Sequence, residues 1–234
     1  MLGPSSGSTP TLPAASAVTN SLRQATSDTG EIARLRREFH AVHCVRLPQL
    51  LEPPLLAFLE RRLEQGQWQT RTYPGVGEEY VLEDLPALNL LHFVSNLPDF
   101  RNLIQEITGC GPLRRFRGRI YRMTAAAGHY DDWHDDNFDN RLVGISLNLM
   151  PRAFRGGLFQ LRERESQRML AEIANTGRSS ALIFRIADEL QHRISTMEGD
   201  EPKTAFAGWF RPDLPEFFAE LRANARKAAA SARP

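Results

Sequence analysis

The sequence predicts an α+β protein with a mainly β core, in which a jelly roll is supported by N-terminal helices. Apolar residues recur at helical spacing in the first half of the chain, whereas strand patterns dominate from Arg115 onward. These strands are short and are separated by Pro, Gly and Asn/Asp clusters, which is typical of an antiparallel jelly roll, or double-stranded β-helix. A chain of 234 residues is long enough for one well-buried domain with appendages.

The two ends of the chain differ in composition from its centre. Residues 1–28 are rich in Ser, Thr, Pro, Ala and Gly and have no hydrophobic periodicity, so we expect a disordered leader. Residues 29–222 are expected to form a single domain, with helical support over 29–113, a jelly-roll core over 114–211 and a C-terminal helix over 213–222. Residues 223–234 lack an apolar face, and we expect them to fray.

Two helices of the first half are predicted with both of their ends. The first begins at Pro53-Pro54 and ends before Gly66, because Pro is favoured in the first turn of a helix and Gly just after its last residue. The second covers 98–108 and ends before Gly109, with phenylalanine, leucine and isoleucine on one face.

The second half of the chain predicts six strands and one helical insertion. The strands are Phe116–Met123, Leu142–Met150, Gly157–Arg162, Ala181–Ile186, His192–Met197 and Thr204–Phe210. The insertion is expected over 163–176, where Met169, Leu170 and Ile173 follow a helical spacing. Gly156-Gly157 predicts a tight turn or a close approach of two backbone segments.

Charge, hydropathy and cysteine content narrow the functional classes. The net charge of +1 gives no field that would attract nucleic acid or an acidic membrane. No apolar run approaches the roughly 20 residues that span a bilayer, and the N-terminus does not resemble a secretory signal. Cys44 and Cys110 are expected to be buried free thiols, which indicates a reducing, cytoplasmic setting.

One cluster of residues points to metal chemistry. Residues 129–136 read His-Tyr-Asp-Asp-Trp-His-Asp-Asp, and His192 follows 56 positions after Asp136. Alternate residues of a strand point the same way, so His134 and Asp136 would hold one ion together, with His192 as a third ligand. Two imidazoles and one carboxylate form a facial set for ferrous iron and leave positions open for a co-substrate and dioxygen. A structural zinc site would instead need four ligands, usually including cysteine.

A second His-x-Asp pair leaves an alternative open. His129 and Asp131 precede His134 and Asp136 by five residues and present the same two ligand types at the same spacing. The pair His134/Asp136 is favoured because it directly precedes the turn into the strand that begins near Arg141. If His129 and Asp131 do not bind the metal, they are candidates for contacts with the substrate or with the metal ligands.

The second half of the chain resembles the Fe(II)- and 2-oxoglutarate-dependent dioxygenases, and more narrowly their prolyl-hydroxylase-like branch. The resemblance covers roughly residues 115–211 and is carried by a series of short motifs. They are Tyr121, the segment Trp133-His134-Asp135-Asp136, the strand from Arg141 to Leu149, Gly156-Gly157, the segment 181–184, His192 and the segment 203–210. Residues before 115 match only loosely, as supporting helices.

The resemblance implies an active site and a reaction. His134, Asp136 and His192 would bind Fe(II), and Lys203, 11 positions after His192, would hold the distal carboxylate of 2-oxoglutarate with the help of the Tyr121 hydroxyl. The implied reaction uses O2, decarboxylates 2-oxoglutarate to succinate and CO2, and hydroxylates a substrate. The halogenases of this family replace the carboxylate ligand with a small residue, so a carboxylate at position 136 indicates hydroxylation or a related oxidation.

Two other functions remain open from the sequence. A cupin-like jelly roll that binds metal without redox chemistry would have no use for a cation at Lys203. A nucleic-acid demethylase would use Arg115, Arg117 and Arg119, which alternate along one strand, although an exposed strand face is the simpler interpretation. Trp133 is expected to line the substrate pocket, whereas Trp68 and Trp209 are expected in the core. The substrate, a small molecule or a protein side chain, and the oligomeric state are not determined by the sequence.

Overall fold

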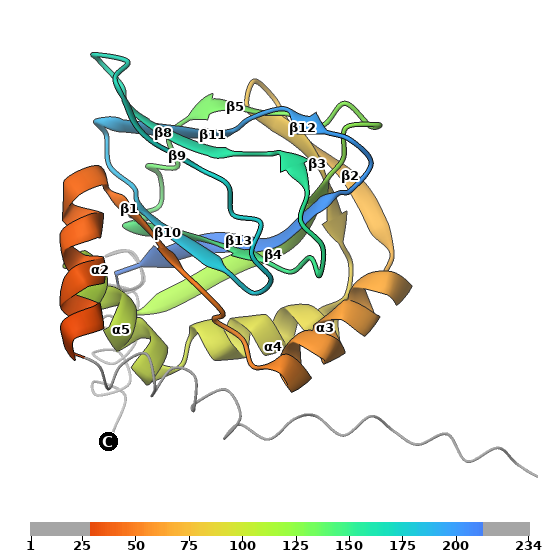
Figure 1. The fold of residues 1–234 in the computed structure, drawn as a ribbon, viewed down its shortest axis with the longest axis horizontal. Helices are drawn as coiled ribbons and strands as arrows, with labels where there is room; N and C mark the ends of the chain where they lie inside the picture. The colour runs from red at the N-terminus through yellow and green to blue at the C-terminus, as the bar shows by residue number, and fades with distance from the viewer. Residues whose placement is uncertain (1–28, 213–234) are drawn as a thin grey trace, which may run out of the picture.

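The computed structural model describes residues 29–212, so the leader, the C-terminal helix and the tail expected from the sequence lie outside the described residues. Four helices, a strongly curved antiparallel sheet and a second sheet of two short strands make up this part of the chain (Figure 1). The helices are α2 (Thr29–Val42), α3 (Pro53–Gln65), α4 (Leu85–Ser95) and α5 (Pro98–Thr108). None of them is long and apolar enough to cross a membrane.

The strands form a nearly closed barrel, as in a jelly roll. The first seven strands are β1 (Cys44–Leu47), β2 (Trp68–Tyr73), β3 (Gly77–Leu82), β4 (Arg115–Met123), β5 (Asp131–His134), β6 (Val143–Asn148) and β7 (Arg155–Gly156). The remaining six are β8 (Phe159–Glu163), β9 (Met169–Ile173), β10 (Ala181–Arg185), β11 (Leu190–Ile194), β12 (Met197–Glu198) and β13 (Lys203–Arg211). The main sheet runs in the order β1-β10-β6-β13-β4-β3-β5-β11-β8-β9, with β2 paired to β3, and it folds back so that β5, β11 and β8 lie over β10, β6 and β13 (Figure 1).

Strand alternation divides the buried side chains into two cores. Along β13, Phe206 and Phe210 point outward and pack with the helices, whereas Ala205 belongs to the core inside the barrel. The outer core joins the helices to the convex face of the larger layer. The inner core is built from residues such as Phe159 and Phe184, and it surrounds the space where the predicted ligands lie.

The two predicted helices occur with the predicted ends. Helix α3 begins at Pro53 and is followed by Gly66, and α5 ends at Thr108 with Gly109 in the left-handed conformation (φ 67°). Helices α2 and α4 were not individually predicted. The first turn of α4 is capped by Asp84, whose carboxylate accepts a hydrogen bond from the amide of Ala87 and forms an ion pair with Arg62 of α3.

Two features of the secondary structure differ from the sequence-based expectation. The helical insertion expected over 163–176 is wrong: β8 and β9 form a hairpin there, with Phe159 opposite Ile173. Three apolar residues at helical spacing are too few to outweigh the backbone hydrogen bonds that the edge of β8 offers. The first half also contains the hairpin β2–β3, whose second strand pairs with β4 and β5 and so becomes a wall of the barrel.

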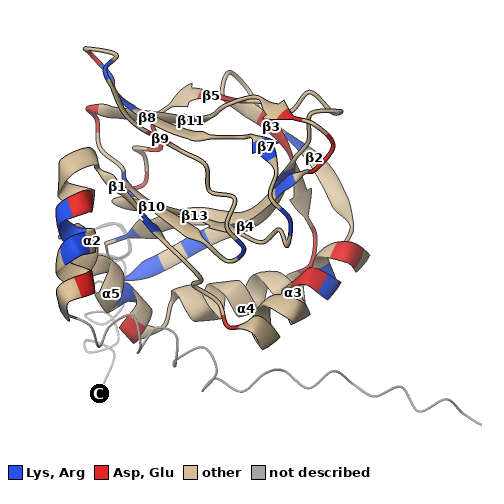
Figure 2. Ribbon diagram, in the orientation of Figure 1, with Lys and Arg blue, Asp and Glu red and all other residues tan. Residues whose placement is uncertain are grey.

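Other expectations agree with the structure. Gly156 and Gly157 both have positive φ, and a side chain at Gly156 would lie 2.2 Å from the carbonyl oxygen of Thr196, as a close backbone approach requires. Cys44 is a buried free thiol, as expected, whereas Cys110 is a free thiol that is only half-buried. Acidic and basic residues are interspersed over α2 and α3 rather than gathered by sign (Figure 2).

Candidate metal centre

The two histidines of the predicted ligand set are cross-strand partners. Strands β5 and β11 are antiparallel neighbours, and His192 lies directly opposite His134, with the ring centroids 4.4 Å apart. The register shifts between His192 and Ile194, because Ile194 pairs with Asp131, three residues before His134. This bulge places both Asp131 and His134 in the wall of the same cavity.

Asp136 completes the set from a loop and not from a strand. Strand β5 ends at His134, so Asp136 is not on the same strand and the expected alternation of side chains does not explain its position. The loop after β5 brings Oδ2 of Asp136 to 3.4 Å from Nε2 of His192 and 3.9 Å from Nε2 of His134. One ligand atom from each of the three residues lies within 4.8 Å of the others, which is a spacing that one metal ion would bridge.

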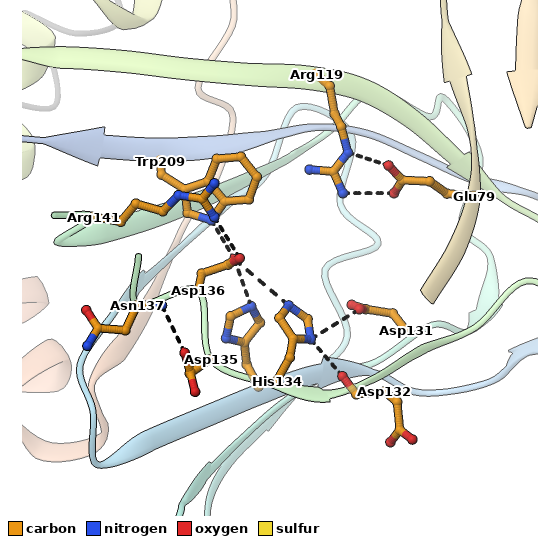
Figure 3. A network of polar contacts seen from close by, with 11 residues as sticks. Glu79, Arg119, Asp131, Asp132, His134, Asp135, Asp136, Asn137, Arg141 and Trp209 are labelled. Carbon is orange, nitrogen blue, oxygen red and sulfur yellow. Dashed lines mark hydrogen bonds and ion pairs between the residues drawn. The ribbon is translucent and has the colours of Figure 1, made fainter. Parts of the chain in front are cut away.

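Both oxygens of the Asp136 carboxylate have a donor from the protein (Figure 3). Nη1 of Arg141 donates to Oδ1 over 2.8 Å, and Nε1 of Trp209 donates to Oδ2 over 2.5 Å. The guanidinium of Arg141 lies between the rings of Phe138 and Trp209, at 3.5 and 3.6 Å from their centroids. Burial by itself would raise the pKa of Asp136, but the interaction with His192 and the positive charge of Arg141 hold this pKa at about 2. The carboxylate is therefore anionic at neutral pH.

The backbone fixes the tautomer of His134. Its Nδ1 lies 2.7 Å from the carbonyl oxygen of Asp132 and 3.4 Å from the carboxylate of Asp131 (Figure 3). Since a carbonyl oxygen only accepts, the proton is on Nδ1, and the lone pair of Nε2 faces Asp136 and His192. A metal-binding histidine needs this arrangement.

His129, the alternative metal ligand from the sequence, lies outside the metal cluster. His129 is buried against the ring of Tyr80, and its Nδ1 accepts a hydrogen bond from the amide of Thr124 over 3.1 Å. Burial lowers the pKa of His129. Within residues 29–212, His134, Asp136 and His192 form the candidate metal cluster, and His129 is not part of it. Asp131 lies beside the cluster, in contact with His134, and burial raises its pKa.

A cavity of about 490 Å³ opens in front of the three residues. Tyr121 and Trp133 lie in its wall, as expected. Lys203 also points into the barrel but lies behind the wall, where its Nζ donates to the carbonyl oxygen of Gly157 over 2.8 Å and faces the ring of Phe154 at 5.8 Å. Burial lowers the pKa of Lys203 to about 8, against an opposing effect of the Asp131 carboxylate.

An arginine expected in a surface stripe lies in this cavity. Arg119 lines the cavity and forms a two-pronged ion pair with Glu79 of β3, whereas Arg115 and Arg117 on the same strand are exposed. A continuous stripe of three exposed arginines is therefore wrong, because the side chain of Arg119 is held in the cavity by Glu79 of the neighbouring strand β3.

Trp209 was expected in the core, and its contact with Asp136 was missed. The alternation of side chains along β13 could have indicated that Trp209 points inward. Trp209 is six residues after Lys203, so both point into the barrel if either does. The role of Arg141 had no comparable signal, because its contact with Asp136 depends on the path of the loop between them.

The donor set suits ferrous iron. It offers two imidazole nitrogens and one carboxylate oxygen, and both cysteines of the chain lie outside it. Three ligands on one side of an ion leave other positions free, whereas a structural zinc site would be closed by four.

Solved structures with the same fold are Fe(II)- and 2-oxoglutarate-dependent oxygenases. A prolyl-4-hydroxylase from Pseudomonas putida superposes with a TM-score of 0.60 at 16% identity, covering 78% of this chain and 99% of its own. A 2OG-Fe(II) oxygenase family oxidoreductase from Burkholderia pseudomallei gives 0.58 at 16%, covering 79% and 92%. The non-heme alpha-ketoglutarate-dependent epimerase SnoN from nogalamycin biosynthesis gives 0.61 at 12%, covering 79% and 82%. No protein-family model and no curated protein matches the sequence. The chain thus has the jelly-roll fold of these oxygenases, including their prolyl-hydroxylase-like members.

Proposed function

We propose that the protein is an Fe(II)- and 2-oxoglutarate-dependent oxygenase that hydroxylates an organic substrate. The observation that carries this proposal is the convergence of His134, Asp136 and His192 inside a jelly roll shared with oxygenases of this kind. Bound iron, with 2-oxoglutarate and O2, would supply the oxidation of a C–H bond to an alcohol, with release of succinate and CO2.

Three residues would hold the iron, and their neighbours would keep them in place. Nε2 of His134, Nε2 of His192 and Oδ2 of Asp136 face one another and would be the ligand atoms. Trp209 and Arg141 would fix the plane of the carboxylate, and the Asp132 carbonyl would keep His134 in its metal-binding tautomer.

Lys203 would hold the distal carboxylate of 2-oxoglutarate. An ammonium group has three N–H donors, and within the described residues only the neutral Gly157 carbonyl accepts one. A buried cation with one neutral partner is costly, and an incoming carboxylate would relieve that cost. The hydroxyl of Tyr121, in the nearby wall, is a candidate for a second contact with the co-substrate.

An anaerobic titration tests the proposal. Fe(II) is added to the purified protein, then 2-oxoglutarate, and the weak visible charge-transfer band of a bidentate chelate is followed. We expect the band in the natural protein and its loss in Asp136→Ala and His192→Ala. In Lys203→Met, Fe(II) should still bind, and a higher concentration of 2-oxoglutarate should be needed. Metal binding without any band would overturn the proposal and favour a jelly roll that only binds metal.

A further inference from the structure

The cavity contains a second polar feature besides the metal cluster. Arg119 of β4 donates through Nε and Nη2 to the two carboxylate oxygens of Glu79, with 3.0 Å for the Nη2 contact. The Tyr73 hydroxyl donates to the same carboxylate over 3.1 Å. Both Glu79 oxygens are thus occupied, and the guanidinium is held in one orientation.

One edge of this guanidinium remains available. Within residues 29–212, Nη1 of Arg119 has no hydrogen-bond partner, although the residue lines the cavity. In Figure 3 the ion pair lies across the site from His134, and the free end of Arg119 points to the side of Trp209 and Asp136. A fixed N–H donor therefore faces the space in front of the metal cluster.

The surroundings of this donor are aromatic. The guanidinium lies 5.3 Å from the ring centroid of Tyr73, 5.4 Å from that of Tyr121 and 5.6 Å from that of Trp209. Two exposed aromatic side chains, Tyr130 (48%) and Phe138 (58%), also line the cavity. Such walls offer flat faces on which a ring would stack, and a volume of about 490 Å³ suits a small molecule.

The two arginines that line the cavity are already paired. Glu79 neutralises Arg119, and Asp136 neutralises Arg141. Of the other wall carboxylates, Asp135 is paired with Arg164, whereas Asp131 and Glu78 contact neutral groups, the His134 imidazole and the Thr72 hydroxyl. An anion entering this space would therefore leave water without gaining a free counter-charge, and an ammonium group would lack the acceptor that Nη1 of Arg119 requires.

We infer that the primary substrate is an uncharged, ring-bearing small molecule with a carbonyl, hydroxyl or ether oxygen that accepts a hydrogen bond from Nη1 of Arg119. This inference rests on the proposed function, because it assigns the cavity in front of the metal cluster to the molecule that is oxidised. Arg119 would orient that molecule, and Glu79 would hold Arg119.

A matched series of naphthalene probes tests the inference by ligand-observed NMR, with Zn(II) in place of Fe(II) and 2-oxoglutarate present. The probes are 2-acetylnaphthalene, naphthalene, 2-naphthoate and 2-naphthylmethylammonium. One added hydrogen bond should make 2-acetylnaphthalene bind roughly tenfold more tightly than naphthalene, and both charged probes should bind more weakly than the ketone. The double variant Glu79→Leu/Arg119→Met, which removes both charges, should lose the preference for the ketone and keep the affinity for naphthalene. Arg115→Met, exposed on the same strand, is the control and should leave all four affinities unchanged.

Tighter binding of either charged probe than of the ketone would overturn the inference, as would an unchanged preference in the double variant. The probe series on the natural protein decides the question even if the double variant does not fold. The charge-transfer band, measured on the same preparation with Fe(II), separates the two proposals. A band without ring binding contradicts this inference alone, whereas ring binding by a protein that gives no band contradicts the proposed function.

Discussion

Nε1 of Trp209 donates a hydrogen bond to Oδ2 of Asp136, the same oxygen that faces both imidazoles of the candidate metal centre. Arg141 occupies the other oxygen. The carboxylate is thus held in one plane, with its metal-facing oxygen fixed by an indole from β13, the strand that also bears Lys203.

Trp209→Phe should weaken metal binding. The ring is retained, but the N–H donor to Asp136 is lost, and loss of such a contact to a metal ligand costs roughly tenfold in affinity. Competition with a fluorescent chelator would measure the dissociation constant for Fe(II) or Co(II). Trp68→Phe is the matched control, because Trp68 stacks on Arg122 at the other end of the barrel wall and does not line the cavity. Equal affinities in the two variants would show that the indole does not act on Asp136.

Substitutions of His134 and His129 should have different effects on metal binding. His134→Ala should abolish tight binding of Co(II), because it removes one of three ligands. His129→Gln should leave the dissociation constant unchanged, since His129 contacts Tyr80 and the Thr124 amide instead. Calorimetric titration of both variants with Co(II) distinguishes the two ligand assignments. The opposite result would assign the metal to His129 and Asp131.

The stability of the ligand-free protein should depend on Lys203 in alkaline solution. The pKa of this group falls from 10.5 to about 8 on folding, so between these pH values the unfolded chain binds more protons. The free energy of unfolding should therefore rise as the pH increases from 8 to 10.5. Below pH 8 the buried charge is a full cost, and Lys203→Met should stabilise the protein at pH 7 by about 3 kcal/mol.

Urea denaturation of the natural protein and of Lys203→Met at pH 7 and pH 10 measures this effect. The variant controls for every other group that titrates in the same range. If the difference in unfolding free energy between the two proteins is the same at both pH values, the Lys203 ammonium is not buried as the structure has it.

Gly208→Ala should separate two strands of the barrel. Gly208 lies opposite Gly118, and an added Cβ would be 2.1 Å from the Arg117 carbonyl oxygen and 2.4 Å from the Gly118 Cα. Both are backbone atoms that cannot move aside, so we expect a loss of about 3 kcal/mol in the free energy of unfolding. Gly128→Ala is the comparison, because no atom lies within 4 Å of its Cβ position and only its positive φ opposes the change, at a cost of about 1 kcal/mol. Chemical denaturation of both variants would measure the two losses, and equal losses would contradict the crowding at Gly208.

Local sequence patterns located the elements that have clear ends. Prolines and glycines marked both ends of α3 and α5, and short apolar segments between turn residues marked β4, β6, β10 and β13. The same reasoning failed for β9 and for the hairpin β2–β3, because these strands depend on a neighbouring strand for their hydrogen bonds and carry little apolar pattern of their own.

The sequence by itself determined which metal-ligand types the chain offers, since His134, Asp136 and His192 and their spacing already indicated a site for ferrous iron. Only the tertiary structure decided which groups surround that site. The bulge between β5 and β11 brings Asp131 beside His134, the loop after β5 turns Asp136 toward the two imidazoles, and the pairing of β3 with β4 joins Glu79 to Arg119. These contacts join residues far apart in the chain or across an irregular loop, where no repeating pattern relates sequence spacing to distance in space.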